Sequence, residues 1–306
     1  MSLSESSLSA QLLQPDIPSA IQAALAFGRS NWATGSVHTD PFYTLPLNTI
    51  SNPSPPGTLL KVQESIDPTL YSLPHSVYIT RIIYQSLTLT GDSVPVSAYI
   101  LWPLSPRTNP DGAYQVVAWA HGTSGIFPEC APSHLRNLHQ HFLAPYTLAL
   151  PGYVVVATEY SGLGVSFSHH PDNEPITHLY LANPAAANDV IYSVVAARSA
   201  FPSLGSSFVS IGHSQGGGAI WAVAQHHAKD KIEGYLGGVS ISPTTDMRGD
   251  PDPIGSIVWA GMMLGVKKVF PEFQFLDTFT EEGFAALNVY KTIEGDGAVG
   301  MGLFSP

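Results

Sequence analysis

Four continuous apolar runs, separated by helical segments, constrain the fold of this chain more than any other feature of its sequence. Runs of this kind are typical of strands in a parallel sheet that is covered by helices on both faces. The runs are residues 116–121, 153–158, 208–212 and 235–242, and the predicted helices are 134–150, 184–199 and 216–229. Asn183 is the N-cap candidate of the second helix. The sequence therefore predicts an α/β fold with a mostly parallel sheet.

The segments before the first of these runs show a different pattern. Residues 77–88 and 94–102 are rich in β-branched and aromatic residues, and the turn sequence between them predicts an antiparallel hairpin. Residues 1–58 contain one predicted helix, 17–29, and a stretch rich in Pro, Ser and Asn. We expect this N-terminal extension to wrap around the core.

After Asp246 the strand pattern stops. Two apolar helical stretches follow, at 254–270 and 280–291, and they predict a helical lid or cap after the sixth strand. We therefore divide the chain into the N-terminal extension (1–58), the core (59–245) and a partial lid (246–306).

The composition excludes several classes of partner. Charged residues make up 11% of the 306 residues, against about 25% in typical domains, and the formal net charge is -11. An acidic chain is repelled by phosphate backbones and by anionic membranes, so we expect no nucleic-acid partner and a neutral or apolar small-molecule substrate. The longest apolar run, 257–266, is shorter than the ~20 residues that span a bilayer, so we expect no membrane span.

The cysteine count and the N-terminus narrow the chemistry and the compartment. Cys130 is the single cysteine, which excludes an intrachain disulfide and a thiolate metal site, and we expect no metal and no cofactor. Residues 1–15 have neither a basic region nor a continuous apolar region, so they do not resemble a signal peptide. The triplet Asn52-Pro53-Ser54 is blocked as a glycosylation site by its proline. These observations favour an intracellular protein, or a sequence whose leader is missing.

The segment Ile211-Gly212-His213-Ser214-Gln215-Gly216 carries a motif for nucleophilic catalysis. It places G-x-S-x-G directly after an apolar strand and directly before a helix, and this context makes the motif specific. The turn is so tight that a side chain at either glycine would clash, and it exposes the Ser214 hydroxyl at the positive end of the helix dipole. We expect Ser214 to be the nucleophile; the alternative is a tight turn with a structural role.

A second loop is expected to face this serine. His121-Gly122-Thr123 follows the run 116–121, at the same edge of the sheet. Acyl transfer passes through an oxyanion, which α/β-hydrolases bind with the N–H of the residue after the serine and a second N–H from this loop. Gln215 and Thr123 are the predicted oxyanion-hole donors. His121 is either part of this site or a structural histidine at the end of the strand.

With these motifs in order, the sequence resembles the fungal secretory lipase family, whose members are α/β-hydrolases with an inserted helical lid that cleave carboxylic esters, including triacylglycerols. The matching pieces are Asp40-Pro41-Phe42-Tyr43-Thr44 with Pro46, residues 96–103, His121-Gly122-Thr123, Cys130-Ala131-Pro132-Ser133, Tyr160-Ser161-Gly162-Leu163-Gly164 with His178 and Tyr180, and residues 212–217. The resemblance implies that Ser214 is the nucleophile and that the Thr123 loop binds the oxyanion. It also implies secretion, which is usual in the family.

The sequence departs from this family in its triad. In α/β-hydrolases the acid and the histidine follow the serine, on loops after the last strands. Here no histidine follows His227. His213, His226 and His227 belong to the turn at Ser214 or to its helix, which carries His226 and His227 away from the active-site end. His169, His170 and His178 on an earlier loop would be unusual bases, and Asp246 and Asp250 are candidate acids. We therefore expect a chain that stops inside its lid, lacks the last strands together with the acid and histidine of the triad, and hydrolyses esters poorly.

Three functions remain open. The first is a serine carboxylic ester hydrolase; the second is a non-catalytic binding protein that keeps the pocket; the third is an acyltransferase or peptidase on the same scaffold. Because nothing after Asp246 has the pattern of a strand that could pair with 235–242, we also expect self-association, through this uncovered edge or through the apolar lid face at 257–266.

Overall fold

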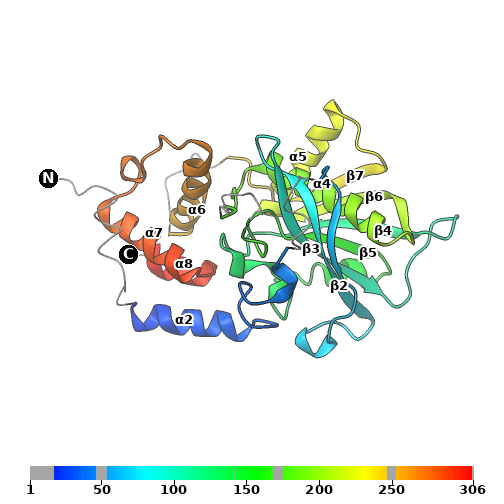
Figure 1. Cartoon of the computed structure of the whole chain (residues 1–306), viewed down its shortest axis with the longest axis horizontal. Coiled ribbons are helices and arrows are strands. Elements are labelled where there is room, and N and C mark those ends of the chain that lie inside the picture. Colours follow the sequence, from blue (N-terminus) through cyan, green and yellow to red (C-terminus); the bar gives the residue numbers. More distant parts are fainter. Residues whose placement is uncertain (1–16, 46–53, 141, 168–174, 247–252, 305–306) are drawn as a thin grey trace.

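The fold is built around one seven-stranded mixed sheet with the strand order β1-β2-β3-β5-β4-β6-β7 (Figure 1). It is seen in a computed structural model of the chain, which describes residues 17–45, 54–140, 142–167, 175–246 and 253–304. The strands are β1 (Leu59–Gln63), β2 (Val77–Leu87), β3 (Ser93–Pro103), β4 (Tyr114–Ala120), β5 (Val154–Thr158), β6 (Leu204–His213) and β7 (Tyr235–Ile241).

The two halves of the sheet differ in strand direction. Strands β1, β2 and β3 pair antiparallel, and β3 is also antiparallel to β5. Strands β5, β4, β6 and β7 are parallel to their neighbours. The predicted hairpin and the predicted parallel strands are therefore confirmed. Strand β1 was not predicted, and it adds an edge strand beside β2.

Helices cover both faces of the sheet, as predicted. The helices are α2 (Ser19–Ser30), α3 (Tyr146–Ala149), α4 (Asn183–Ala200), α5 (Gln215–Lys229), α6 (Pro253–Val269), α7 (Glu281–Ile293) and α8 (Gly297–Phe304). Val154 and Val156 of β5 pack in one core cluster with α4, whereas Val155 and Ala157 pack in a second cluster that includes Tyr146 of α3. Alternate residues of β5 thus enter opposite cores, which explains why its sequence is continuously apolar.

The predicted helix at 134–150 is wrong. Only its last turn is α-helical, in α3, and the preceding residues pair with the N-terminal segment instead: Ala33 N donates to His134 O and Arg136 N donates to Asn31 O, both at 2.8 Å. The fully buried side chain of Leu138 packs in the second core cluster. Long-range backbone pairing and burial therefore outweigh local helix propensity here.

Asn183 is not the N-cap of α4. The helix begins at this residue, so the N-cap position belongs to Ala182, whose side chain makes no capping hydrogen bond. Asn183 instead faces α5, because a Cβ built on Gly218 would lie 2.6 Å from its Oδ1. The prediction placed this helix start one residue late.

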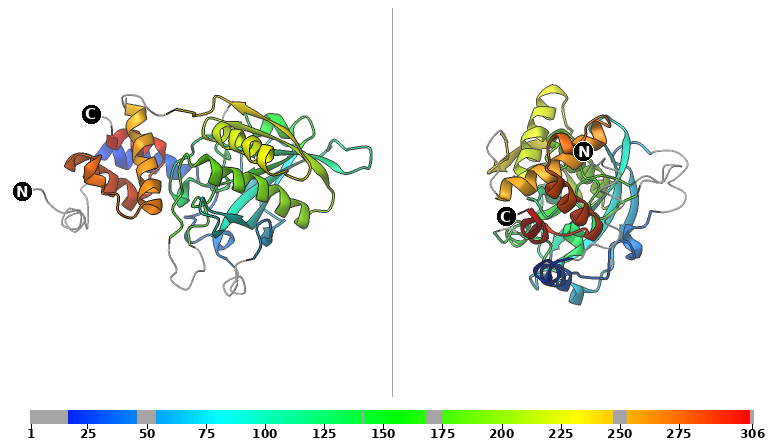
Figure 2. Two further views of the ribbon diagram at one scale, coloured as in Figure 1. Left: turned by 90° about the horizontal axis from the view of Figure 1, so that it is seen from above. Right: turned by 90° about the vertical axis from the view of Figure 1, so that its left-hand side faces the viewer.

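The N-terminal helix packs with the C-terminal helices at one end of the molecule. Figure 1 and Figure 2 show α2 beside α8, and a Cβ built on Gly302 of α8 would lie 2.5 Å from Ile21 Cδ1 of α2. Helix α6 packs its apolar residues, among them Ala260 and Met263, against Phe284 and Leu287 of α7. The apolar run 257–266 is thus largely covered. In the part of the chain that the structure describes, no helix combines the length and the apolar character needed to cross a bilayer.

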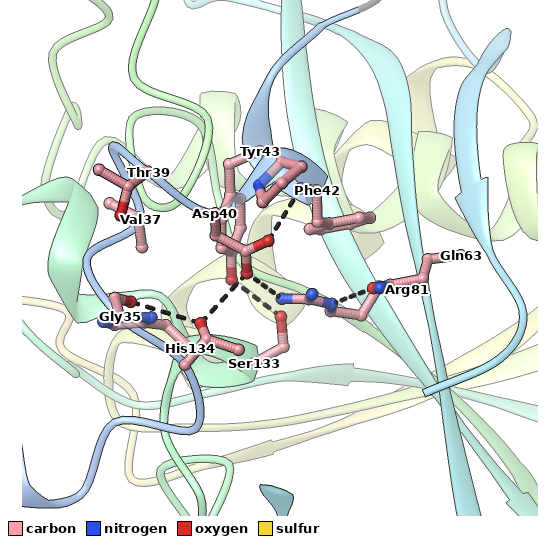
Figure 3. A network of polar contacts seen from close by, with 12 residues as sticks. Gly35, Val37, Thr39, Asp40, Phe42, Tyr43, Gln63, Arg81, Ser133 and His134 are labelled. Atoms are coloured by element: carbon pink, nitrogen blue, oxygen red, sulfur yellow. Dashed lines mark hydrogen bonds and ion pairs between the residues drawn. The ribbon is translucent and has the colours of Figure 1, made fainter. Parts of the chain in front are cut away.

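A buried ion pair joins the N-terminal segment to the sheet (Figure 3). Arg81 Nη1 of β2 lies 3.2 Å from Asp40 Oδ2, and both side chains are more than nine-tenths buried. Arg81 Nε also donates to Gln63 Oε1 at 2.8 Å, and its guanidinium lies 4.1 Å from the centre of the Phe42 ring. The other carboxylate oxygen of Asp40 accepts from the backbone N–H of Phe42 at 2.9 Å. The pair therefore fixes where residues 40–43 cross the sheet.

Removal of one partner of this pair should be strongly destabilising. In Asp40→Ala the guanidinium of Arg81 would stay buried without its ion-pair partner, and we expect the free energy of unfolding to fall by about 3–5 kcal/mol. Urea unfolding followed by circular dichroism measures this change. Asp230→Ala, at an exposed position, is the control and should change stability by less than about 0.5 kcal/mol. Equal stability of the two variants would show that the pair is not important for stability.

Strand β7 is expected to promote self-association. Among the described residues it pairs with β6 alone, and its apolar side chains Leu236, Val239 and Ile241 are 71%, 54% and 42% exposed. An apolar edge with unpaired N–H and C=O groups can add a strand from another chain. Sedimentation over a concentration series should show association that is weaker in Val239→Lys. A clean monomer at every concentration, with no effect of the lysine, would contradict this prediction.

Candidate active site

Ser214 lies on a sharp turn between a parallel strand and a helix. Strand β6 ends at His213 and α5 begins at Gln215, and Ser214 between them has φ 54 and ψ -116. A left-handed conformation in a residue other than glycine costs about 1–3 kcal/mol and is typical of functional sites. Ser214 N donates to Ile241 O of β7 at 2.9 Å, which holds the turn, and the residue is half-buried.

Two glycines allow the strand, the turn and the helix to pack this closely. A Cβ on Gly212 would lie 2.3 Å from Gly216 O, and a Cβ on Gly216 would lie 1.9 Å from Ala120 O. Real Cβ atoms do not approach backbone oxygens so closely, because van der Waals repulsion prevents it. The first turn of α5 therefore lies directly against the end of β4, where the loop containing Thr123 begins.

Of the two predicted oxyanion-hole residues, Gln215 lies at this junction of β4 and α5, and Thr123 lies on the loop that follows β4. Gln215 is the first residue of α5, so its N–H has no acceptor within the helix and lies at the positive end of the dipole. Within the described residues, the N–H groups of Gln215 and Thr123 donate to no protein acceptor. Thr123 is fixed by other contacts: its Oγ1 lies 2.8 Å from Tyr180 Oη, and its carbonyl accepts from His139 Nε2 at 3.0 Å.

His178 connects the turn at Ser214 to the loop that carries Thr123. The sequence did not predict this role. The Nδ1 of His178 donates to Ser161 O at 2.9 Å, so its Nε2 is left to accept from the side-chain amide of Gln215 at 3.0 Å. The His178 ring stacks near Tyr160 and lies 6.1 Å from the ring of Tyr180, the partner of Thr123. The spacing of these residues in the sequence gives no signal of this contact; only the fold brings residues 178 and 215 together.

Burial keeps the imidazole rings of His178 and His121 neutral. Burial lowers the pKa of His178 to about 4, although its hydrogen bond to Ser161 opposes the shift. Burial likewise lowers the pKa of His121 to about 3. His121 Nδ1 donates to Gly122 O at 2.6 Å, and its ring packs 4.5 Å from that of Tyr160. This placement favours the structural interpretation of His121.

Two of the other candidate bases lie away from Ser214. His226 and His227 lie in the last turn of α5, at the opposite end from the serine. The ring of His213 packs 5.3 Å from that of Phe142. Within the described residues, no histidine hydrogen-bonds to Ser214 Oγ. Three of the predicted candidates, His169, His170 and Asp250, lie outside the described residues, while Asp246 lies at their margin.

Two cavities flank the loop that follows β4. The first, of about 550 Å³, lies between Thr123, His139 and the helices α2 and α8. The second, of about 450 Å³, lies between Phe127, His178 and Leu264 of α6. Ser214 is not among the described residues that line either cavity. The C-terminal helices α6 to α8 therefore complete spaces whose other walls come from α2 and from loops that include Thr123 and His178.

The neutral state of His178 predicts a specific pH dependence of stability. The unfolded chain takes up a proton at this histidine below about pH 6.5, whereas the folded chain resists it down to about pH 4. Stability is therefore fully present above pH 6.5 and is lost as the pH falls, by about 2 kcal/mol between pH 7 and pH 5. In His178→Gln, whose amide can keep both hydrogen bonds, this part of the loss should vanish.

Urea unfolding at pH 7 and pH 5 tests this expectation, with His75→Gln at an exposed position as the control. Parallel stability curves for wild type and His178→Gln would show that His178 is not held neutral.

Proteins of known structure resemble this chain at low sequence identity. No family model matches it, and no curated protein matches its sequence. Candida antarctica lipase A in its closed state matches 78% of this chain and 55% of its own, with a TM-score of 0.57 and 16% identity. A putative hydrolase of Legionella pneumophila matches 74% of this chain and 64% of its own (TM-score 0.54, 17% identity).

A further structural match is the esterase LipA of Xanthomonas oryzae, which is described as rice cell wall degrading. It matches 72% of this chain and 62% of its own, with a TM-score of 0.53 and 19% identity. The chain thus spans 55% to 64% of the lengths of these three proteins. Together with the strand order and the strand–turn–helix at Ser214, the matches show that the chain has the α/β-hydrolase fold.

Proposed function

We propose that this chain is a carboxylic ester hydrolase of the lipase or esterase type, which acts through an acyl-enzyme on Ser214. The observation that carries the proposal is the left-handed turn at Ser214, set between β6 and α5 and packed against the Thr123 loop. The lipases and esterases among the structural matches support an ester as the substrate class. The formal net charge of -11 supports a neutral or apolar ester rather than an anionic one.

In the proposed reaction, Ser214 Oγ attacks the carbonyl carbon of the ester while a base takes the hydroxyl proton. The carbonyl oxygen becomes an oxyanion and accepts hydrogen bonds from the N–H groups of Gln215 and Thr123. The C–O bond to the alcohol then breaks, and the alcohol leaves with the proton. Water attacks the acyl-enzyme by the same steps in reverse, which releases the acid and restores Ser214.

The proposed reaction needs a base, and within the described residues no histidine hydrogen-bonds to Ser214 Oγ. His178 contacts Gln215, the residue after Ser214, but its two ring nitrogens are both used, by Ser161 and Gln215. Serine hydrolases without their triad partners keep only about 10³- to 10⁴-fold acceleration over water, from the oxyanion hole and binding. We therefore propose slow turnover by these 306 residues.

We also propose that helices α6 to α8 act as a lid over the site. Gly261 of α6 packs on Tyr180, where a Cβ would lie 2.9 Å from Cδ1 of the ring. Tyr290 of α7 packs edge-on against Phe127, with ring centres 4.8 Å apart. Both contacts lie next to the loops that carry Thr123 and His178. An apolar cover at this position would exclude water from the ester carbonyl.

Labelling with a fluorophosphonate probe tests whether Ser214 is a nucleophile. We expect slow covalent labelling that mass spectrometry places on Ser214, that is absent in Ser214→Ala and that is unchanged in the exposed control Ser203→Ala. Labelling depends on the oxyanion hole and on Oγ, so it detects the site even where turnover is poor. No labelling of the wild-type chain would favour a non-catalytic binding protein on the same fold.

Hydrolysis of a short chromogenic ester should be slight, and Ser214→Ala should change it little, because no described histidine activates Oγ. Robust turnover that disappears in Ser214→Ala would contradict the weak-base argument. In that case His178→Gln, measured beside it, would show whether His178 had been recruited as the base. Transfer of the acyl group to an added alcohol in preference to water would favour an acyltransferase.

A further inference from the structure

A histidine and two glutamates from distant parts of the sequence meet beside the two cavities that flank the loop after β4. His38 belongs to the N-terminal segment, Glu129 to the short 3-10 helix Pro128–Cys130, and Glu294 to the turn that ends α7. Each offers one ligand atom, and these atoms all lie within 4.8 Å of one another. His38 Nε2 and Glu294 Oε2 are already 2.9 Å apart. The cluster thus joins three separate segments of the chain at one point.

Glu129 is held in place for this arrangement by neighbours on three sides. Ser36 Oγ donates to its Oε1, the backbone N–H of Val37 donates to Oε2 at 3.0 Å, and His134 Nε2 lies 3.1 Å from Oε2. The carboxylate is therefore oriented, as carboxylate ligands of metal ions usually are.

The chemistry of the cluster suits a cation of intermediate softness. Two carboxylates and a neutral imidazole carry a charge of -2, and oxygen with imidazole nitrogen is a donor set that zinc accepts. Tetrahedral zinc with bonds of about 2.0–2.2 Å sets its ligand atoms about 3.3 Å apart. His38 and Glu294, which are partly exposed, can close the remaining gap by rotation of their side chains. Water can fill the fourth position.

We propose that His38, Glu129 and Glu294 form a structural site for a divalent cation, with zinc as the best-fitting ion. The site lies in the wall between the two cavities, because Glu129 and Glu294 line the first and His38 and Glu294 line the second. A bound cation would tie the turn between α7 and α8 to the N-terminal segment and to the loop after β4. The sequence predicted no metal because its single cysteine excludes a thiolate site, and residues 38, 129 and 294 are too far apart along the chain to form a recognisable motif.

Zinc binding to the untagged full chain tests the proposal without reference to ester hydrolysis. Equilibrium dialysis with metal analysis should find one zinc ion per chain, and thermal unfolding should shift upward by several degrees at a hundredfold excess over Kd. His38→Ala and Glu294→Gln should each weaken binding by at least about tenfold, as expected for the loss of one ligand or its orienting partner. These two residues are chosen because both are partly exposed, so that their variants can fold.

Matched controls separate this site from other zinc-binding side chains. His75→Ala and Glu272→Gln change exposed residues of the same types outside the cluster, and both should bind zinc as the wild type does. Circular dichroism of each metal-free variant verifies its fold. The absence of zinc binding by the wild type would overturn the proposal, and so would binding that His38→Ala and Glu294→Gln leave unchanged.

Discussion

The close approach of α5 to the end of β4 is the constraint on which the rest of the structure depends. At Gly216 a side chain would overlap the backbone oxygen of Ala120, so the helix can begin at this depth only where a Cβ is missing. Because β6 must turn into α5 within one residue, Ser214 takes a left-handed conformation that its own side chain disfavours. The same packing sets the N–H of Gln215 beside the loop of Thr123. Ser214, the proposed nucleophile, and Gln215, a proposed oxyanion donor, are therefore positioned by one backbone contact.

The short motifs that carry the resemblance to the lipase family are weak evidence individually, but their residues contact one another in the fold. Tyr43 Oη lies 3.0 Å from Ser133 Oγ, which connects two of the short motifs. Gly162 has a positive φ and lies so close to the backbone of His178 that a Cβ would be 2.4 Å from its N atom. The ring of His178 in turn stacks on Tyr160. The order of these pieces along the chain thus reflects one packed layer around the loop after β4, and this explains why the set is more specific than its members.

The sequence predicted the central strands well, because strands that are buried on both faces have a continuously apolar sequence. It failed where tertiary contacts decide the conformation. Helix α8 has three glycines in eight residues, which argues against a helix locally, yet it packs against α2 and Tyr290. Strand β1 is short and only half-buried, so its alternation is not distinct from that of a loop. Ser214 could be predicted because its motif is local; the His178–Gln215 contact could not, because it joins loops that only the fold brings together.

The hydrogen bonds of His178 allow it to position the residue next to Ser214 but not to activate the Ser214 hydroxyl. An imidazole whose Nδ1–H is given to Ser161 O has one lone pair left, at Nε2, and Gln215 takes it. A proton accepted from Ser214 would have to displace that amide and charge a ring whose pKa burial has lowered to about 4. His178 is therefore suited to orient the residue after Ser214 and unsuited to be a base for Ser214. In the proposed acyl transfer, the rate then depends on which group can take the proton of Ser214.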